Sequence, residues 1–297
     1  MARTAEWPWY QAYTGPDDYR MRELLRAVLD LHGYFGDQDE WVWRGQASAK
    51  YCLSPAVHTR ITTARLALDD AAVVNTTNRL LCEARTARID THEGVALPDL
   101  ALLSVLQHHG AATPLLDVSL DPLVALYMAV VSPTAEHSRH DGVLFALKRP
   151  RDESPDLAIR PFDNRSFESV YDSLPRDKAV FYTAPDVSER LRIQRGHFLL
   201  ARHSTESRRV TIPLTVETCR VSDTWLAKRM DQRGKSGKPV PATTDIATFR
   251  VPWKFKPRLQ QWLEERTGLT SGFVYPTPWH QPHLEMWAKS QSRVSRL

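Results

Sequence analysis

The segment DPLVALYMAVV, residues 121–131, constrains the fold more than any other part of the sequence. Its uninterrupted apolar run is only about half as long as a membrane-spanning helix needs, so it predicts a helix buried in a soluble core. Asp121 is a suitable N-cap and Pro122 fits the first helical position. We therefore expect this helix to form a rigid wall inside the protein.

Polar residues gather directly before that apolar helix. A helix over residues 96–110 is predicted to end in His108, His109 and Gly110, and residues 113–119 read as a strand. The N-terminus of the following helix then faces the end of this strand. Its unpaired amides and positive dipole suit an anion or a developing negative charge. We interpret His109, Asp117 and Ser119 as site residues, and Asp121 as a structural cap.

The remaining pattern favours an α+β fold in a single domain, residues 1–297, with a small mixed or antiparallel sheet flanked by N-terminal helices. Helical patterns dominate early and short strands come later, without regular βαβ alternation. Further elements are predicted as helices over 21–35, 61–90, 256–268 and 283–289, and as strands over 41–46, 142–148, 197–202, 208–214 and 246–253. We expect a helical lead-in over 1–40, a long loop or lid over 149–186 and a basic mobile loop over 228–244.

Composition narrows the class of protein. A chain of 297 residues can bury a sizeable core, and a net charge of +4 favours an anionic partner only weakly. The three cysteines lie far apart without a CxxC pair, which argues against a disulfide framework or a thiolate zinc site. The sequence MARTAEWPWYQAY lacks a signal-peptide core, so we expect a cytoplasmic protein without membrane contact. Nucleophile-elbow, zincin and dinucleotide-binding motifs are absent.

The tetrapeptide WRGQ, at the end of the predicted first strand, is a candidate ligand contact. Arg44 offers a planar fork that suits a phosphate or carboxylate, and Gly45 would let a ligand approach the backbone beside Gln46. Alternatively, Arg44 is structural and pairs with a buried acid such as Asp117. Both interpretations stay open.

Two later clusters carry weaker signals. Gln194 lies in RLRIQRGHF among apolar positions, where an exposed strand start explains it equally well. His280, His283 and Glu285 fall within HQPHLE, but Pro282 interrupts the helical spacing that metal ligands require. We expect no metal there.

The pattern as a whole resembles the FRG domain family, which is mostly bacterial. The similarity rests on WxWRGQ with Leu53, Pro55 and Arg60, and on the block from Gln107 to Ala129. It continues in Arg192–Phe198, in VPWKFKPRLQQWLEERTGLTSGFVYP and in Leu284 with Glu285.

A second, more distant similarity is to the ADP-ribosyltransferase layout, which implies an ADP-ribosyltransferase-like fold with NAD as substrate. It assigns catalytic roles to Arg44 and Ser119, with Glu285 or Gln194 as the late residue. Around the nucleotide it implies the set Arg44, Gly45, Gln46, His108, His109, Thr113, Asp117 and Tyr127. In this set Arg44 and the Asp121 helix hold the diphosphate, a histidine binds a ribose hydroxyl, and Tyr127 stacks on nicotinamide.

Three functional hypotheses follow. The first is an NAD-dependent ADP-ribosyltransferase or NAD glycohydrolase, acting as a toxin or phage-defence effector on an RNA, DNA or protein acceptor. The second is a non-catalytic module that senses a nucleotide or nucleic acid with the same pocket. The third is a metal-assisted nuclease, which needs a divalent ion at His280, His283 and Glu285 or around Asp117.

Overall fold

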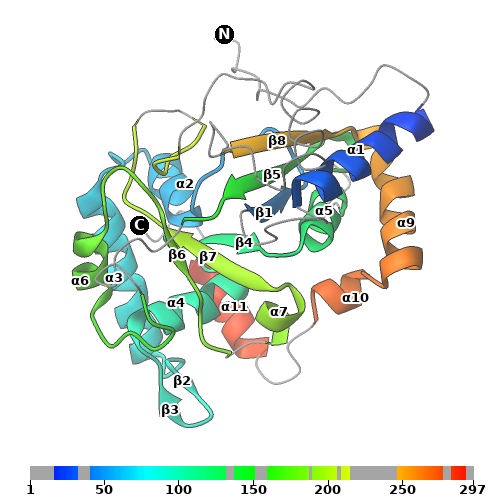
Figure 1. The fold of residues 1–297 in the computed structure, drawn as a ribbon. Helices are drawn as coiled ribbons and strands as arrows, with labels where there is room; N and C mark the ends of the chain where they lie inside the picture. Colours follow the sequence, from blue (N-terminus) through cyan, green and yellow to red (C-terminus); the bar gives the residue numbers. More distant parts are fainter. Residues whose placement is uncertain are drawn as a thin grey trace, which may run out of the picture. The chain divides into compact units, whose positions relative to one another are not determined.

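The structure is a computed structural model with a mixed α/β fold (Figure 1). It describes residues 17–32, 41–131, 137–150, 159–186, 189–205, 209–214, 246–276 and 282–291. The chain divides into two compact units, each built from three separated stretches. Unit 1 comprises Met1–Tyr51, Ser119–Arg149 and Thr215–Phe273, and unit 2 comprises Cys52–Val118, Pro150–Leu214 and Val274–Leu297.

Unit 1 is organised around antiparallel strands. Strand β1 (Trp41–Gln46) pairs with β5 (Gly142–Lys148), and β5 pairs with β8 (Ile246–Val251). Ser119, the last residue of β4 (Leu116–Ser119), is the register partner of Trp43. Side chains alternate between the two faces of a strand, so Trp43 and Gly45 share one face while Arg44 points to the other.

Helix α5 (Pro122–Val130) packs on the face that carries Gly45. A Cβ added at Gly45 would lie 1.8 Å from the carbonyl oxygen of Ala125, and one added at Gly142 would lie 2.4 Å from that of Ala129. The helix therefore approaches two neighbouring strands at backbone distance. Unit 1 also holds α1 (Asp17–His32), η1 (His137–Arg139), η3 (Trp253–Phe255) and α9 (Lys256–Thr267), with α10 (Ser271–Val274) at its end.

Unit 2 is mainly helical around its own apolar core. Its helices are α2 (Ala56–Thr63), α3 (Asp70–Thr86), α4 (Asp99–His108), α6 (Phe167–Ser173), α7 (Glu189–Ile193) and α11 (Pro282–Gln291). Strands β6 (Val180–Tyr182) and β7 (Gly196–Leu200) pair antiparallel, as do β2 (Thr91–His92) and β3 (Val95–Ala96). Leu100, Leu103 and Leu106 of α4 are fully buried in this core.

The predicted antiparallel sheet and mixed composition are confirmed, with several local differences. The helix predicted over 61–90 is two helices, because Arg65 has a left-handed φ of 59° and Asp69 caps α3 through the Ala72 amide. The segment 149–186 contains α6, capped by Ser166, and β6. The strand predicted over 208–214 is only an isolated bridge from Val210 to Leu53.

Other predictions on organisation are not decided. Neither unit is a continuous half of the sequence, and the single domain over 1–297 stays a prediction. The basic loop over 228–244 and residues 1–16 and 33–40 of the lead-in lie outside the described residues. Among the helices that are described, none combines enough length with enough apolar character to span a bilayer.

Candidate functional site

The predicted site residues are divided between the two units. Unit 1 holds Arg44, Gly45, Gln46, Ser119 and Tyr127. Unit 2 holds His108, His109, Thr113, Asp117, Gln194 and Glu285.

Arg44 and Ser119 lie on neighbouring strands but on opposite faces. Trp43 is the register partner of Ser119, and cross-strand partners share a face, so the next residue of β1 points away. Arg44 instead lies opposite Phe145. Ser119 is only 3% exposed, and its Oγ accepts a hydrogen bond of 2.9 Å from the Asp121 amide. The Ser119 hydroxyl thus shapes the turn into α5.

The N-terminus of α5 is capped by the protein's own carboxylate. The Oδ1 atom of Asp121 accepts hydrogen bonds from the amides of Leu123, at 2.8 Å, and Val124, at 3.4 Å. These amides belong to the donor group that we predicted for a diphosphate. Because Asp121 engages them, the cap is confirmed and this helix end does not carry the candidate site.

Gly45 and Tyr127 serve the packing of unit 1. The close approach of α5 explains the glycine by packing, and the predicted role of Gly45 in ligand approach stays a prediction. Tyr127 is 0% exposed, its hydroxyl donates to Glu264 Oε1 at 3.1 Å, and it shares a 3.0 Å hydrogen bond with Ser271 Oγ. The stacking role predicted for Tyr127 would need its ring at a surface, whereas this ring lies in the interior.

In unit 2, the QHHG motif is tied to β4 by a hydrogen-bonded network. Gln107 Nε2 donates to Asp117 Oδ2 at 2.7 Å. The hydroxyl of Thr113, which is fully buried, donates to Gln107 Oε1 at 2.6 Å and accepts from the Leu115 amide at 3.2 Å. The network fixes the orientation of the Asp117 carboxylate, and it explains Thr113 as a positioning residue.

His108, at the end of α4, is an unusual buried polar group. Both of its ring nitrogens are buried, and no described residue forms a hydrogen bond with them. Its ring packs against that of Phe198 in a T-shaped arrangement, at a centroid distance of 5.8 Å. Burial lowers the pKa of His108 to about 4, while the Asp117 carboxylate opposes the shift and Arg190 adds to it. The imidazole is therefore neutral at pH 7, so one nitrogen can accept and the other can donate.

Arg190 and Tyr275 lie at the same end of α4. Arg190 is in α7, and its Nη1 donates to the His108 carbonyl at 2.9 Å. Its guanidinium lies 5.0 Å from the centre of the Tyr275 ring. Neither residue was predicted from the sequence to belong to a site. A basic residue two positions from Arg192 in RLRIQRGHF was visible, but nothing in the sequence linked it to His108.

Gln194, His109 and Glu285 have different surroundings. The Gln194 amide is 6% exposed and donates to the Val274 carbonyl at 2.8 Å, a contact that connects two distant segments of unit 2. His109 is the C-cap residue of α4. Glu285 falls in α11, with its side chain outside the described residues, as are the side chains of the predicted HQPHLE histidines. The described residues contain no cluster of three or more potential metal ligands.

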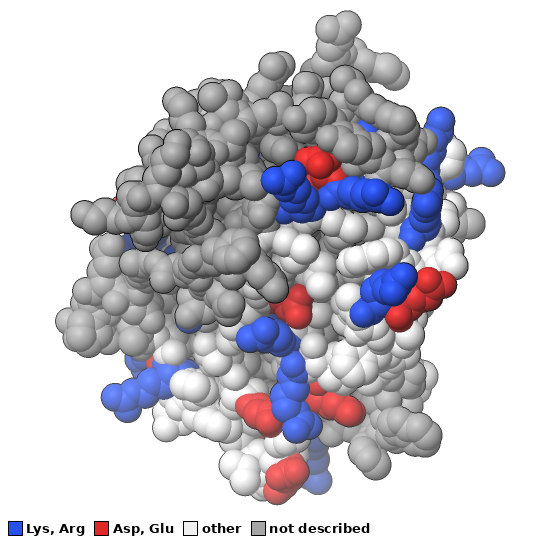
Figure 2. All heavy atoms as spheres, turned by 45° about the vertical axis from the view of Figure 1, so that its right-hand side comes forward, with Lys and Arg blue, Asp and Glu red and all other residues white. Residues whose placement is uncertain are grey.

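Charged side chains of both signs are mixed on the molecular surface. Figure 2 shows blue Lys and Arg side chains beside red Asp and Glu side chains on the face that it draws. Among the ion pairs, Arg165 binds Asp163 at 2.6 Å, and Arg250 binds Asp141. These arginines are engaged by carboxylates, so they are poor candidates for binding a nucleic-acid backbone.

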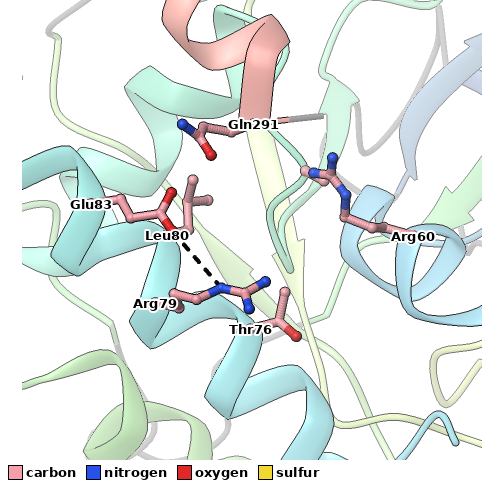
Figure 3. A pocket seen from close by; sticks show the side chains of 7 residues that line it. Arg60, Thr76, Arg79, Leu80, Glu83 and Gln291 are labelled. Atoms are coloured by element: carbon pink, nitrogen blue, oxygen red, sulfur yellow. Dashed lines mark ion pairs between the residues drawn. The ribbon is translucent and has the colours of Figure 1, made fainter. Parts of the chain in front are cut away.

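A hollow lined by arginines was also missed. It is an open hollow in unit 2, and its wall includes Arg60, Arg79 and Thr76 (Figure 3). Arg60 entered the sequence analysis only through the family resemblance. Arg60 comes from α2 and Arg79 from α3, so no sequence spacing could have linked the two arginines.

Comparison with known proteins supports the family resemblance over part of the chain. Residues 39–138 match the FRG domain. This FRG segment contains WRGQ, the Gln107–Asp117 network and helix α5, so the predicted resemblance is confirmed there. The motif around Gln194 and the C-terminal motifs lie beyond it. No curated protein and no solved structure matched the sequence.

Proposed function

We propose that the protein binds NAD or a related nucleotide at the C-terminal end of helix α4. The observation that carries the proposal is the neutral His108 ring, whose two buried nitrogens have no hydrogen-bond partner in the described part of the chain. Buried polar atoms are nearly always hydrogen-bonded, and exceptions often mark functional sites. A bound ligand that forms hydrogen bonds with the two His108 nitrogens would explain why they are buried without partners among the described residues.

The groups around His108 suit the parts of a nucleotide. Ribose hydroxyls are donors that need acceptors, and the His108 imidazole and the Asp117 carboxylate supply them. The Arg190 guanidinium suits a phosphate, and the Tyr275 ring beside it offers an aromatic surface for a base. Together these groups match a sugar, a phosphate and a base.

Cleavage of NAD, by hydrolysis or by ADP-ribosyl transfer, is the second candidate function. It is favoured by the Asp117 carboxylate, which Gln107 orients in the same cluster. Breaking the bond between nicotinamide and ribose develops positive charge on the sugar, and a fixed carboxylate nearby stabilises that charge. The resemblance to the ADP-ribosyltransferase layout points to the same reaction.

The first experiment measures NAD binding to the purified full-length protein by isothermal titration calorimetry. Arg190→Met should weaken binding about 10- to 100-fold, the range expected for loss of one charged hydrogen-bonding group. Arg192→Met is the matched control, because Arg192 is 66% exposed and pairs with Asp186 at the surface. Absence of NAD binding, or equal binding by the Arg190 and Arg192 variants, would overturn the proposal.

Nicotinamide release separates the two candidate functions. Wild-type protein and Asp117→Asn are incubated with NAD, with and without RNA, DNA and protein acceptors. Release that is lost in Asp117→Asn supports cleavage, and its dependence on an acceptor distinguishes transfer from hydrolysis. Binding without release under every condition supports a sensing module.

A further inference from the structure

The arginine-lined hollow of unit 2 has the composition of an anion site. It is lined by Arg60, Thr76, Arg79, Leu80, Glu83, Ala112 and Gln291. These residues come from α2, α3, the segment after α4 and α11. Figure 3 shows the side chains of Arg60 and Arg79 approaching the hollow from opposite sides, with Gln291 on a third.

Arg60 is a buried cation, and the described residues give it no counter-charge. It is 9% exposed, and its Nε and Nη2 atoms are buried. Within the described ranges, no residue forms a hydrogen bond with these two atoms and no carboxylate forms an ion pair with Arg60. The contrast within unit 2 is Arg202, whose side chain is 11% exposed and binds Asp70 at 2.9 Å. Because burying an unpaired charge is costly, a site that keeps Arg60 in this state is suited to an external anion.

Arg79 adds a second positive charge that is only weakly neutralised. Its Nε lies 3.9 Å from Glu83 Oε1, and the side chains are 46% and 43% exposed. Exposed pairs at such distances contribute little, so Arg79 can rotate toward a ligand at small cost. Burial lowers the pKa of Arg60, and the neighbouring charge of Arg79 lowers it further. An anion between the two guanidinium groups would remove that repulsion.

We propose that this hollow binds a phosphate group, held between Arg60 and Arg79. A carboxylate is satisfied by one guanidinium fork, whereas phosphate has more acceptor oxygens and a higher charge, and it suits donors that converge from several directions. The Thr76 hydroxyl and the Gln291 amide provide further donors in the same wall. Inorganic phosphate and a phosphate monoester share this chemistry.

The phosphate site is separate from the proposed nucleotide site, because His108, Asp117 and Arg190 do not line the hollow. The two proposals can therefore fail independently. Asp117→Asn should weaken NAD binding and leave phosphate binding unchanged. Arg60→Met should weaken phosphate binding and leave NAD binding unchanged.

The test is isothermal titration of the full-length protein with inorganic phosphate and with glycerol 3-phosphate, at constant ionic strength set with chloride. Arg60→Met should weaken binding of the preferred ligand at least 10-fold, the loss expected for a charged hydrogen-bonding group. Arg79→Gln changes a half-exposed side chain and should weaken binding without disturbing the core. Arg88→Gln is the matched control, because Arg88 is exposed and does not line the hollow.

Thermal unfolding provides a second measurement. Phosphate should raise the Tm of the wild-type protein in a saturable way and leave that of Arg60→Met unchanged. Without ligand, Arg60→Met should be at least as stable as wild type, since the substitution removes an unpaired buried charge. Tighter binding of inorganic phosphate or of glycerol 3-phosphate would identify the source of the group. The proposal is overturned if neither inorganic phosphate nor glycerol 3-phosphate binds saturably. It is also overturned if Arg60→Met and Arg79→Gln bind the preferred ligand with the same affinity as Arg88→Gln.

Discussion

The substitution Gly45→Ala tests the contact between strand β1 and helix α5. The new Cβ would lie 1.8 Å from the Ala125 carbonyl oxygen and 2.8 Å from the Ala129 nitrogen, where ordinary contacts begin at 3.4 Å. The oxygen contact is therefore too short by 3.4 − 1.8 = 1.6 Å. Both obstacles are helix backbone, which cannot rotate away as a side chain would, so the strand and the helix must separate.

The size of the effect follows from overpacking. Extra methyl groups in packed cores cost about 1–3 kcal/mol, and a backbone obstacle places this one at the upper end. The Tm of a domain falls by roughly 2–4 °C for each kcal/mol of unfolding free energy lost, so a loss of about 3 kcal/mol lowers the Tm by about 6–12 °C. Thermal unfolding followed by tryptophan fluorescence is the assay, since the buried Trp41 and Trp43 lie in β1 itself.

Gly272→Ala is the control, because no atom lies within 4 Å of a Cβ added at that position in α10. Its stability should stay within about 0.5 kcal/mol of wild type. The reasoning is refuted if Gly45→Ala unfolds within 3 °C of wild type, an interval of about 1 kcal/mol. In that case the glycine would need another explanation, such as the close approach of a ligand.

Three further predictions concern polar groups in unit 2. Asp70→Asn should lower the free energy of unfolding, measured by urea titration, by about 2–4 kcal/mol, because the Asp70 carboxylate accepts hydrogen bonds from Tyr171 and Arg202. Asp172→Asn is the control: the Asp172 side chain is 67% exposed and lies 3.6 Å from Arg202, so its loss should change the free energy of unfolding by less than about 1 kcal/mol. Gln194→Met should lower the free energy of unfolding in urea by about 1–3 kcal/mol, because it removes the hydrogen bond to the Val274 carbonyl. Nicotinamide release per folded molecule should stay unchanged in this variant. A selective loss of that release would restore Gln194 as a catalytic residue. Burial lowers the pKa of His58 to about 3 and that of His108 to about 4, so as pH falls below 6.5 the unfolded state takes up protons that the folded state does not. Stability should therefore be flat above this pH and fall below it by up to about 1.4 kcal/mol per pH unit for each group, and urea titrations of His58→Phe from pH 7.5 to pH 5 should show a shallower decline.

The local elements were largely predictable because their signals are contained in short stretches of sequence. The strand over 41–46 and the strand over 142–148 have the predicted bounds, and Asp121 caps α5 as its sequence indicated. Where prediction failed, the deciding interaction was an unexpected cap or turn. Arg65 and Asp69 divide the helix predicted over 61–90, and Ser166 starts a helix in a segment that shows little periodicity.

The site was predictable only in part. The sequence pointed to the QHHG block, and the network from Gln107 to Asp117 and Thr113 joins residues at most ten positions apart. Arg190 and Tyr275 could not be assigned to it, because Arg190 reaches the His108 carbonyl across 82 positions. The role of Gly45 was likewise hidden, since the helix that requires it lies far along the chain.

The sequence by itself determined the α+β composition, most strand and helix positions, the cap of α5 and the FRG segment over residues 39–138. These follow from periodicity, capping and motif spacing, which act over a few residues. Only the tertiary structure decided which polar groups are buried without partners. Arg60 and His108 are ordinary polar residues in the sequence, and their burial depends on distant segments that, among the described residues, supply no hydrogen-bond partner for the atoms they cover.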